Sequence, residues 1–433
     1  MRSKPVSPAA TVAVLSVVWM VVNTQRLTAA SFVGASPIMA DFGITAGLAG
    51  LLVSAYFPPY GLLQIPLGIV VDRVAPRRIL LWSVGLLAAS NLLFALAPAV
   101  EWAILARVAV GLSSAPVFIS CLKICSDLSL REYPRRLGIV VTAGSVGMLI
   151  GLSSLPLALA ALPWRTVGLL LVGQVLLLLP ILALAPLPRP TMREPVSVAD
   201  LASAVREQVR SARFWWLTLP AMAWCGSYFG VLGWLPRYAR DVLRSDPALT
   251  GVLPGLFSLG LLVGATLFGA SHTKWRPLGP WLFFGGAICF ALAVGLLPLL
   301  DGLGAASLLY GLALLMGLLF GAFFVWIGLV RDLVVPSRLG TVTGLINGLT
   351  FLPSFVEPWL FGALLDLVDR PQVANPTYSA RAYAIGFGFL AAGMGLGLLG
   401  ALLCGRLRAR SATASGPLEA GQLDLAGPGA VDR

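Results

Sequence analysis

The sequence predicts an all-α integral membrane protein with twelve transmembrane helices, arranged as two six-helix bundles related by pseudo-two-fold symmetry. Hydrophobic residues make up 58% of the 433 residues and charged residues only 11%, with a mean hydropathy of +0.90. Such a composition belongs in a bilayer. Apolar stretches long enough to cross the hydrocarbon core recur along the whole chain, and a short motif repeats at half its length.

Twelve apolar stretches define the expected helices, each close to the roughly 20 residues that a crossing requires. We place them at 10–36, 45–70, 79–97, 101–122, 137–160, 165–186, 214–236, 249–270, 280–300, 304–330, 340–366 and 382–404.

The first stretch has an alternative interpretation as a cleaved signal peptide, because Arg2 and Lys4 precede an apolar run and Ala29 and Ala30 are small. The run continues to Met39 without a polar region. This is far longer than the usual 7–15-residue apolar core of a signal, and favours a retained first helix.

The net charge of +12 fits membrane orientation better than nucleic-acid binding. With both termini in the cytoplasm, 22 of the 30 Lys and Arg residues fall on the cytoplasmic side and 6 in the outer loops. This asymmetry follows the positive-inside rule and predicts a multi-pass protein of the inner (cytoplasmic) membrane. Its partners are then membrane lipid and a small molecule, with no nucleic acid.

The five cysteines lie in or at the ends of apolar segments, so no disulfide framework is expected. The spacing of Cys121 and Cys125 would suit a metal, but the single histidine, His272, lies in a distant loop. Packing of small apolar side chains is the better interpretation. We expect neither a metal nor another cofactor.

Polar segments divide the chain into four parts. Residues 1–186 form the expected N-terminal bundle and 214–405 the C-terminal bundle, joined by the arginine-rich linker 187–213. Four apolar residues share one face of a helix in this linker, which predicts a helix lying on the cytoplasmic membrane surface; they are Val198, Leu201, Val205 and Val209. Residues 406–433 form a tail rich in Ala, Gly and Ser, which we expect to be disordered.

An internal repeat relates the two halves. The segment 133–138, Tyr-Pro-Arg-Arg-Leu-Gly, matches 335–340, Val-Pro-Ser-Arg-Leu-Gly, at an offset of 202 residues between Gly138 and Gly340. A repeat of half the chain length is what two related six-helix bundles require. The match is short.

The segment 68–78, Gly-Ile-Val-Val-Asp-Arg-Val-Ala-Pro-Arg-Arg, lies between the second and third expected helices. It resembles the signature loop of the major facilitator superfamily, and a degenerate echo runs from Gly269 to Arg276. The resemblance implies the major facilitator fold over residues 10–405. It also implies a conformational latch between the halves, formed by Gly68, Asp72, Arg73, Arg77 and Arg78. The alternative is an ordinary basic cytoplasmic loop.

The first half is most similar to the organic anion branches of this superfamily, the anion:cation symporters and organophosphate antiporters. The similarity rests on Asn23-Thr24-Gln25-Arg26, Ala35-Ser36-Pro37, Tyr56, Tyr60, Gln64-Ile65-Pro66 and the Arg107–Gly111 segment. It implies that Arg26 and Arg107 face a central cavity. Two departures concern chemistry, because Ser114 replaces the glutamate of the symporters and Tyr228 the second arginine of the antiporters. A singly charged organic anion is therefore the more economical substrate.

Ionised side chains near the bilayer centre cost about 2.5–3.5 kcal/mol even on insertion scales, so they usually line a cavity or pathway. We place only Arg26, Arg107 and Glu357 well inside expected helices. The alternative role is an interhelical salt bridge without a part in transport.

Helical spacing shows which residues accompany these charges. Trp19, Asn23 and Arg26 share one face of the first helix, and a polar stripe follows the eleventh. For the aromatic residues, packing or interfacial anchoring is an equally good interpretation. The expected substrate-binding residues are Arg26, Asn23, Trp19, Arg107, Trp224, Tyr228, Asn347 and Ser354.

These features predict a secondary transporter, because we find neither an ATP-binding loop nor a catalytic constellation; the chain is not expected to be an enzyme.

The leading hypothesis is proton-coupled symport of an organic anion by a monomer. Glu357 is the expected proton-coupling residue, because the other carboxylates lie at helix ends or in loops. In the alternative interpretation Glu357 has a structural role and only forms a hydrogen bond with a neighbouring polar group. Export of drug-like or amphipathic compounds and a non-transporting sensor are the other hypotheses.

Overall fold

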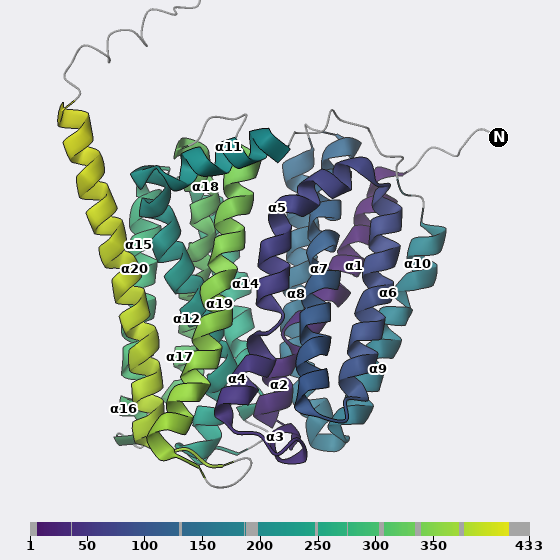
Figure 1. Cartoon of the computed structure of the whole chain (residues 1–433), viewed down its shortest axis with the longest axis vertical. Coiled ribbons are helices and arrows are strands. Elements are labelled where there is room, and N and C mark those ends of the chain that lie inside the picture. The colour runs from purple at the N-terminus through teal and green to yellow at the C-terminus, as the bar shows by residue number, and fades with distance from the viewer. Residues whose placement is uncertain are drawn as a thin grey trace, which may run out of the picture.

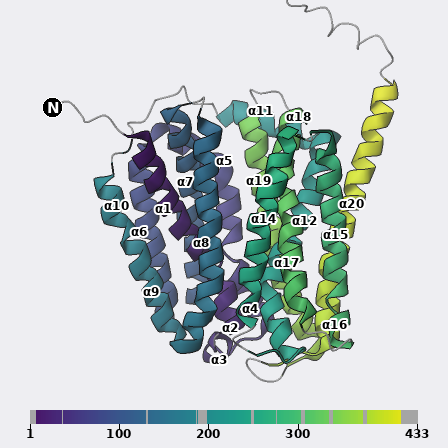
Figure 2. The same ribbon diagram turned by 180° about the vertical axis from the view of Figure 1, so that it is seen from behind.

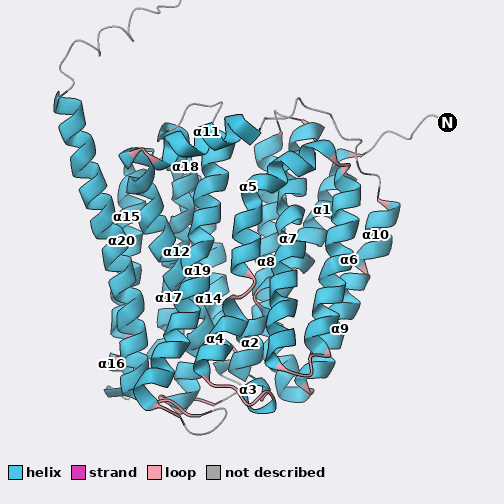
Figure 3. Cartoon of the chain, viewed as in Figure 1, coloured by secondary structure: helices cyan, strands magenta, loops and turns pink. Residues whose placement is uncertain are grey.

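The computed structural model contains only helices and their connections in the part of the chain that it describes (Figure 3). The described residues are 7–35, 37–129, 132–185, 187, 198–246, 250–274, 276–302, 307–333, 339–371 and 376–414.

Within the described residues the N-terminal part contains ten α-helices, some of which are consecutive pieces of one membrane crossing. They are α1 (Pro8–Arg26), α2 (Thr28–Ala35), α3 (Ile38–Asp41), α4 (Ala46–Ser54), α5 (Phe57–Arg73), α6 (Pro76–Ala95), α7 (Val100–Leu128), α8 (Tyr133–Ala161), α9 (Trp164–Leu176) and α10 (Leu178–Leu184).

The C-terminal part begins after the linker helix α11 (Val198–Val209). Its elements are α12 (Ala212–Asp241), α14 (Leu253–Lys274), η1 (Arg276–Leu278), α15 (Gly279–Leu296), α16 (Leu299–Gly302), α17 (Leu308–Gly321), η2 (Ala322–Phe324), α18 (Val325–Leu333), α19 (Leu339–Asp369) and α20 (Ala380–Ala414).

Ten helical segments are long and apolar enough to span a membrane within the described residues. Helices α12, of 30 residues, and α14, of 22 residues, run alongside them and bring the number of crossings to twelve (Figure 1). Three charged residues near the end of α12, Arg237, Arg240 and Asp241, lower its hydropathy. The predicted all-α membrane fold is confirmed.

The two parts of the chain lie side by side (Figures 1 and 2). Helices α1–α10 form one bundle and α12–α20 the other, while α11 lies across one end of the molecule. We call this the linker end, and the opposite end, which carries α3 and α16, the α3 end. The bundles contact each other where α4 and α5 meet α19, where α8 meets α14, and where α2 meets α12.

Several expected crossings are interrupted within the described residues, which the apolar pattern alone did not indicate. The sixth is divided at Leu177 between α9 and α10, and the tenth contains η2 between α17 and α18. The first, expected at 10–36, is interrupted at Leu27 between α1 and α2, and the second, expected at 45–70, between α4 and α5. Pro58 and Pro59 lie in the first turn of α5 and favour the second break, because proline lacks an N–H donor and is best accommodated in the first turn of a helix. The first break has no proline, and its cause lies in the tertiary structure described below.

The linker helix lies where it was expected, whereas the last helix extends beyond its expected end. Helix α11 lies where the amphipathic pattern placed it, and Val205 packs against the apolar core. Helix α20 continues to Ala414, beyond the expected boundary at residue 405, and the remainder of the predicted disordered tail lies outside the described residues. The second copy of the internal repeat, 335–340, also lies mostly outside them.

Glycines allow the closest helix contacts. Where α14 crosses α17, a Cβ atom at Gly317 would lie 1.9 Å from the carbonyl oxygen of Phe257, and one at Gly260 would lie 2.1 Å from that of Leu314. Between the bundles, a Cβ at Gly50 would lie 2.4 Å from the carbonyl oxygen of Pro358. Small residues are the usual means of close helix approach in membranes, where packing replaces the hydrophobic effect.

Substituting Gly317 with alanine should therefore destabilise the protein by about 1–3 kcal/mol, the usual cost of overpacking a core. Gly311→Ala on the same helix is the matched control, because no atom lies within 4 Å of its would-be Cβ and alanine favours the helix. Thermal unfolding in detergent should show a lower midpoint for Gly317→Ala and an unchanged or higher one for Gly311→Ala. Equal midpoints would contradict the contact.

Candidate functional site

A cavity of about 210 Å³ lies between the two bundles. It is lined from the N-terminal bundle by Trp19, Asn23, Arg26, Leu27, Tyr56, Tyr60, Phe118, Val141, Gly144, Ser145 and Met148. From the C-terminal bundle it is lined by Cys225, Tyr228, Phe229, Leu261, Phe320, Phe323, Phe324, Asn347, Thr350 and Phe351. Arg26 is the one ionisable cation or carboxylate among these lining residues.

The guanidinium of Arg26 is held by neutral groups. Its Nη1 donates to Oδ1 of Asn23 at 3.2 Å and its Nη2 to the hydroxyl of Tyr56 at 3.4 Å. Its Cζ lies 4.1 Å from the ring centroid of Tyr60, within the range of a cation–π interaction. Its buried Nε has no hydrogen-bond partner. Within the described residues no carboxylate forms a salt bridge with Arg26.

Trp19 and Asn23 complete the face of α1 that helical spacing predicted. The amide nitrogen of Asn23 donates to the carbonyl oxygen of Trp19 at 2.8 Å, which leaves its oxygen free to accept from Arg26. A Cβ at Gly144 of α8 would lie 2.3 Å from Nε1 of Trp19. Gly144 therefore gives the indole the space that it occupies beside the cavity.

Arg107 does not line the cavity and is 2% exposed. Its guanidinium donates to the carbonyl oxygens of Arg26 and Gln25 and to Oγ1 of Thr28, the latter two at 3.4 Å. At the break the N–H of Ala30 bonds the carbonyl oxygen of Leu27, and the carbonyl oxygen of Gln25 also accepts from Oγ1 of Thr28 at 3.0 Å. Arg107 thus stabilises the break, and the break sets the position from which the Arg26 side chain enters the cavity.

A buried amide cluster supports the same segment from behind. Nε2 of Gln25 donates to Oε1 of Gln174 at 2.7 Å, and the Oε1 of Gln25 accepts from Nδ2 of Asn91 at 3.2 Å. These amide side chains thus satisfy one another, as burial requires, and they fix the side chain of Gln25 next to the break.

Aromatic rings form most of the opposite wall. Tyr228 stacks on Phe320 with ring centroids 3.7 Å apart, and Phe320 stacks on Phe323 at 4.8 Å. Phe320, Phe323 and Phe324 have the spacing of one helical face, a pattern visible in the sequence but not used in our site prediction. The predicted residue Trp224 lies behind this wall, surrounded by rings that include Phe283 and Phe290.

The carboxyl group of Glu357 lies next to the cavity, not in it. Glu357 is 8% exposed, and its Oε2 lies 3.0 Å from Oγ of Ser227. The same hydroxyl lies 3.1 Å from the carbonyl oxygen of Leu390. One turn away on α19, Ser354 donates to the cavity-lining Cys225, which connects the surroundings of Glu357 to the lining.

The structure thus brings five of the predicted substrate-binding residues together in the cavity. They are Trp19, Asn23, Arg26, Tyr228 and Asn347. Arg107, Trp224 and Ser354 lie behind the lining. Of the predicted latch, Gly68, Asp72 and Arg73 are in α5, but their side chains lie outside the described residues, while Arg77 and Arg78 are exposed at the start of α6.

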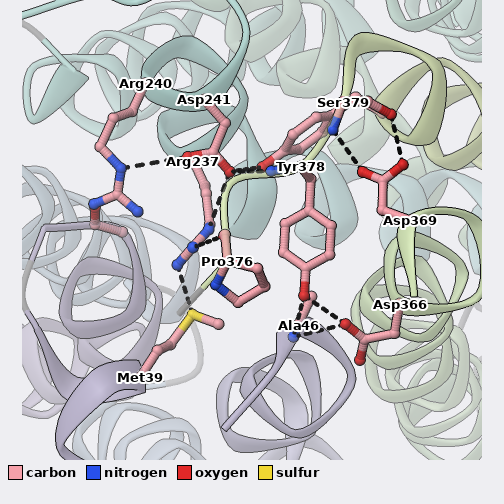
Figure 4. Close-up of polar contacts among 12 residues, drawn as sticks. Met39, Ala46, Arg237, Arg240, Asp241, Asp366, Asp369, Pro376, Tyr378 and Ser379 are labelled. Atoms are coloured by element: carbon pink, nitrogen blue, oxygen red, sulfur yellow. Dashed lines mark hydrogen bonds and ion pairs between the residues drawn. The ribbon is translucent and has the colours of Figure 1, made fainter. Parts of the chain in front are cut away.

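A carboxylate that we had placed at a helix end joins the bundles at the α3 end. Asp366 of α19 accepts from the backbone N–H group of Ala46 at 3.2 Å (Figure 4). It also accepts from the backbone N–H group of Gly47 and from the hydroxyl of Thr45, both at 2.7 Å. Thr45, at the N-cap of α4, makes no cap bond of its own. A negative charge at a helix N-terminus is favourable, so Asp366 of one bundle caps α4 of the other.

The hydroxyl of Tyr378 reinforces this cap. It donates to Oδ1 of Asp366 at 2.5 Å and accepts from the N–H of Ala46 at 2.9 Å (Figure 4). Both Tyr378 and Asp366 belong to the C-terminal bundle, while Ala46 begins α4 of the N-terminal bundle.

A second cluster at the α3 end centres on Asp241. It pairs with Arg237 at 3.3 Å and with Arg240 at 3.5 Å. Arg237 also donates to Sδ of Met39 at 2.6 Å (Figure 4). Arg240 donates to the carbonyl oxygen of Gly34 at 3.2 Å. Arg237, expected in an outer loop, is 1% exposed because the end of α12 is enclosed between the bundles.

The cavity is therefore closed toward the α3 end by two polar clusters that cross from one bundle to the other. Sequence reasoning missed them because each pairs residues that are distant in the chain, such as Asp366 with Ala46 and Arg240 with Gly34. No local pattern indicates such a pairing.

A helical bundle of this form, with a charged central cavity, occurs in several transporter families, and comparison with known proteins distinguishes among them. Residues 15–358 match the family model described as Major Facilitator Superfamily. The chain belongs to the major facilitator superfamily. It is therefore a transporter and not an enzyme.

Relatives in this superfamily are distant. A probable L-galactonate transporter of Escherichia coli (strain K12) is 24% identical over 366 residues, covering 78% of this chain and 79% of the relative. A probable sugar efflux transporter of Helicobacter pylori (strain ATCC 700392 / 26695) is 24% identical over 245 residues, covering 55% and 60%.

Among solved structures, a bacterial homologue of the human lysosomal transporter Spinster is similar in fold. Its inward-facing and occupied form has a TM-score of 0.72 at 17% identity, covering 93% of this chain and 98% of that chain. Its unoccupied form has a TM-score of 0.73 at 18% identity, covering 92% and 98%. At these identities the likeness concerns the fold alone.

The Asp366 cap should control opening toward the α3 end. Asp366→Asn removes the charge at the helix N-terminus, an interaction of about 1 kcal/mol, so the cavity should open to that side roughly fivefold more often. In a variant that retains only the cavity-lining Cys225, a membrane-impermeant maleimide supplied at the side of α3 should react correspondingly faster.

Asp369→Asn is the matched control for this experiment. Asp369 lies one turn further along α19 and bonds Ser379 of its own bundle, at 2.6 Å to the backbone nitrogen and 2.7 Å to Oγ (Figure 4). Its replacement should leave the labelling rate unchanged. Equal rates for both variants would mean that the cap does not hold the bundles together.

Proposed function

We propose that the chain is a secondary active transporter that moves a small organic anion across the inner membrane by alternating access, coupled to protons. The observation that carries this proposal is Arg26, a cation in the central cavity that forms no salt bridge with a described carboxylate.

An anionic substrate supplies what the cavity lacks. An isolated charge away from water is costly unless it is paired and hydrogen-bonded, and the guanidinium of Arg26 has an unbonded Nε and two long hydrogen bonds to neutral groups. A carboxylate matches the fork of donors that arginine presents. The name of the probable L-galactonate transporter agrees with this class, because galactonate is a carboxylate.

The hydroxyl of Ser227 supports a proton-coupling role for Glu357. Its single hydrogen cannot serve both Glu357 and the carbonyl oxygen of Leu390. When the carboxyl is protonated it donates to Ser227, which donates onward to Leu390; when it is ionised, Ser227 turns to the carboxylate. Both protonation states thus have a hydrogen-bonded arrangement, which suits a residue that takes up and releases a proton during transport.

The closed α3 end supports alternating access. Binding from one side requires that the other be sealed, and the Asp366 cap and the Asp241 cluster join the bundles on one side of the cavity only. We propose that the predicted latch around Asp72 takes the corresponding part at the linker end when the cavity opens the other way.

Basic residues support the assignment of the linker end to the cytoplasm. They are concentrated in the linker, around the connection from α5 to α6 that includes Arg73, Arg77 and Arg78, and in the C-terminal tail. An alkaline phosphatase reporter fused after Asp41 or Asp301, both at the α3 end, should be active in the periplasm. Activity of a fusion in the 187–213 linker would reverse the assignment.

Export of drug-like or amphipathic compounds is the second candidate, and the aromatic wall favours it. Ten of the 21 lining residues carry aromatic rings, which also suit lipophilic cations. The two functions differ in the charge that they recognise: carboxylates should stabilise purified protein if Arg26 binds substrate, whereas lipophilic cations should do so in a drug exporter.

Replacing Arg26 tests the anion proposal directly. Arg26→Lys keeps the charge but loses the two-pronged donor geometry, so carboxylate affinity should fall about tenfold, as for loss of one charged hydrogen bond of about 1.5 kcal/mol. Arg26→Ala should abolish measurable binding in calorimetric titrations. Arg165→Ala is the control, because Arg165 donates to Ala95 and Ala97 away from the cavity.

Normal carboxylate affinity in a folded Arg26→Ala protein would refute the anion proposal. Loss of folding in this variant, with normal folding of Arg165→Ala, would instead assign Arg26 a structural role.

Replacing Glu357 separates coupling from binding. Glutamine donates to Ser227 as a protonated carboxyl would, so Glu357→Gln should retain substrate exchange across liposomes and lose accumulation driven by a pH gradient. Glu101→Gln, at the exposed start of α7, should retain both. If the Glu357→Gln protein still concentrates substrate in response to pH, the proton is carried elsewhere.

A further inference from the structure

The aromatic residues of the cavity form a continuous surface that begins at Arg26. The guanidinium lies over Tyr60, and Tyr60 contacts Phe351 of the other bundle with centroids 4.9 Å apart. From Phe351 the contacts continue to Phe229 through Phe57, which is 1% exposed and lies behind the lining, with ring centroids 5.9 and 4.5 Å apart.

The same surface extends across the C-terminal wall. Phe229 meets Tyr228 at 4.9 Å, Tyr228 stacks on Phe320 at 3.7 Å, and Phe320 and Phe323 lead to Phe324. Phe229 and Phe324 are partly exposed, and both line the cavity. A ligand whose charge meets Arg26 therefore has its remainder against rings.

Polar groups at this wall are few, and two of them already have partners in the protein. Oγ1 of Thr350 donates to the carbonyl oxygen of Asn347 at 2.7 Å, and Cys225 accepts from Ser354 at 3.4 Å. The buried hydroxyl of Tyr228 has no hydrogen-bond partner within the described residues, so this single group is available to a ligand hydroxyl. A polyhydroxylated ligand would lose bonds to water here and recover few of them, and unpaired buried hydroxyls are costly.

The number of charged groups in the lining limits the number of negative charges that the ligand can carry. Arg26 is the single basic residue among the lining residues. The buried Arg107 and Arg237 bond backbone and side-chain groups behind the cavity or at the α3 end. One guanidinium matches one carboxylate, so a second negative charge on the ligand would remain without a partner.

We propose that the cavity is selective for aromatic monocarboxylates, molecules with one carboxylate at the end of a flat apolar body. This rests on the proposed function, since it assigns the anionic end to Arg26, and adds that the ring surface from Tyr60 to Phe324 selects the body. It also distinguishes this chain from a transporter of sugar acids, because the ring surface offers few hydrogen-bond partners to the hydroxyl groups of a sugar acid.

The test compares three probes on the purified full-length protein by calorimetry and thermal stabilisation. 3-Phenylpropionate has the proposed charge and body, gluconate has the charge with a polyhydroxylated body, and 3-phenylpropanol has the body without the charge. We expect 3-phenylpropionate to bind and the other two to bind at least tenfold more weakly.

Variants then locate the body. Phe229→Leu and Phe324→Leu each remove one ring of the surface, so affinity for 3-phenylpropionate should fall about 2- to 12-fold, the equivalent of the roughly 0.5–1.5 kcal/mol of an aromatic pair. Phe389→Leu is the matched control: this half-buried phenylalanine of α20 does not line the cavity, and the affinity should be unchanged.

Three results would overturn the inference, and they differ in what else they overturn. If gluconate binds with dependence on Arg26 and 3-phenylpropionate does not, the substrate class is wrong and the anion proposal stands. If 3-phenylpropionate binds equally well to both ring variants and the control, the ring surface does not hold the body. If 3-phenylpropanol binds as tightly as 3-phenylpropionate, the charge is not recognised and the proposed function fails as well. The probe comparison needs no variant and so decides the class even if a ring variant does not fold.

Discussion

The arrangement of the molecule depends on one constraint, that a guanidinium in the middle of a membrane must have its donors satisfied. Arg26 meets this need only partly, through Asn23, Tyr56 and the face of Tyr60. Its main chain is fixed in turn by Arg107, which bonds the carbonyl oxygen of Arg26 where the first crossing breaks. Arg107 bonds two backbone carbonyl oxygens and the hydroxyl of Thr28, whereas the guanidinium of Arg26 bonds only neutral side chains and lines the cavity.

The contacts between the bundles also differ between the interior and the α3 end. In the interior they meet through glycines and rings, which have little directional preference, whereas at the α3 end they meet through charges that cap helices and bond carbonyls across the gap. Polar contacts of this kind are either made or broken, so the bundles can exchange one set of contacts for another as rigid bodies. Such behaviour is required of alternating access.

Much of the fold followed from local patterns in the sequence. Apolar lengths predicted the crossings, and helical spacing placed Trp19, Asn23 and Arg26 on one face of the first, where the structure has them. The remainder depends on pairings that no local pattern encodes. Arg107 had the same hydrophobic surroundings as Arg26, and only the break at Leu27, a tertiary feature, distinguishes a backbone-binding arginine from one that lines the cavity.

The carboxylates illustrate the same limit. Asp366 falls at a helix end and looks solvated in the sequence, yet it caps a helix of the other bundle. Glu357 was singled out for its depth, and it is buried, but its bonding to Ser227 of α12 places it behind the lining. Depth in the membrane is readable from hydropathy, whereas the direction in which a side chain points within the bundle depends on the packing of the neighbouring helices.

A crystal structure of the protein with 3-(4-bromophenyl)propionate tests the central claim most directly, because the anomalous signal of bromine locates the body independently of the carboxylate. The account predicts a carboxylate oxygen within hydrogen-bond distance of the Arg26 guanidinium and the bromine against the rings of Phe229 and Phe324. A carboxylate bound elsewhere, with Arg26 still bonded only to Asn23 and Tyr56, would contradict it.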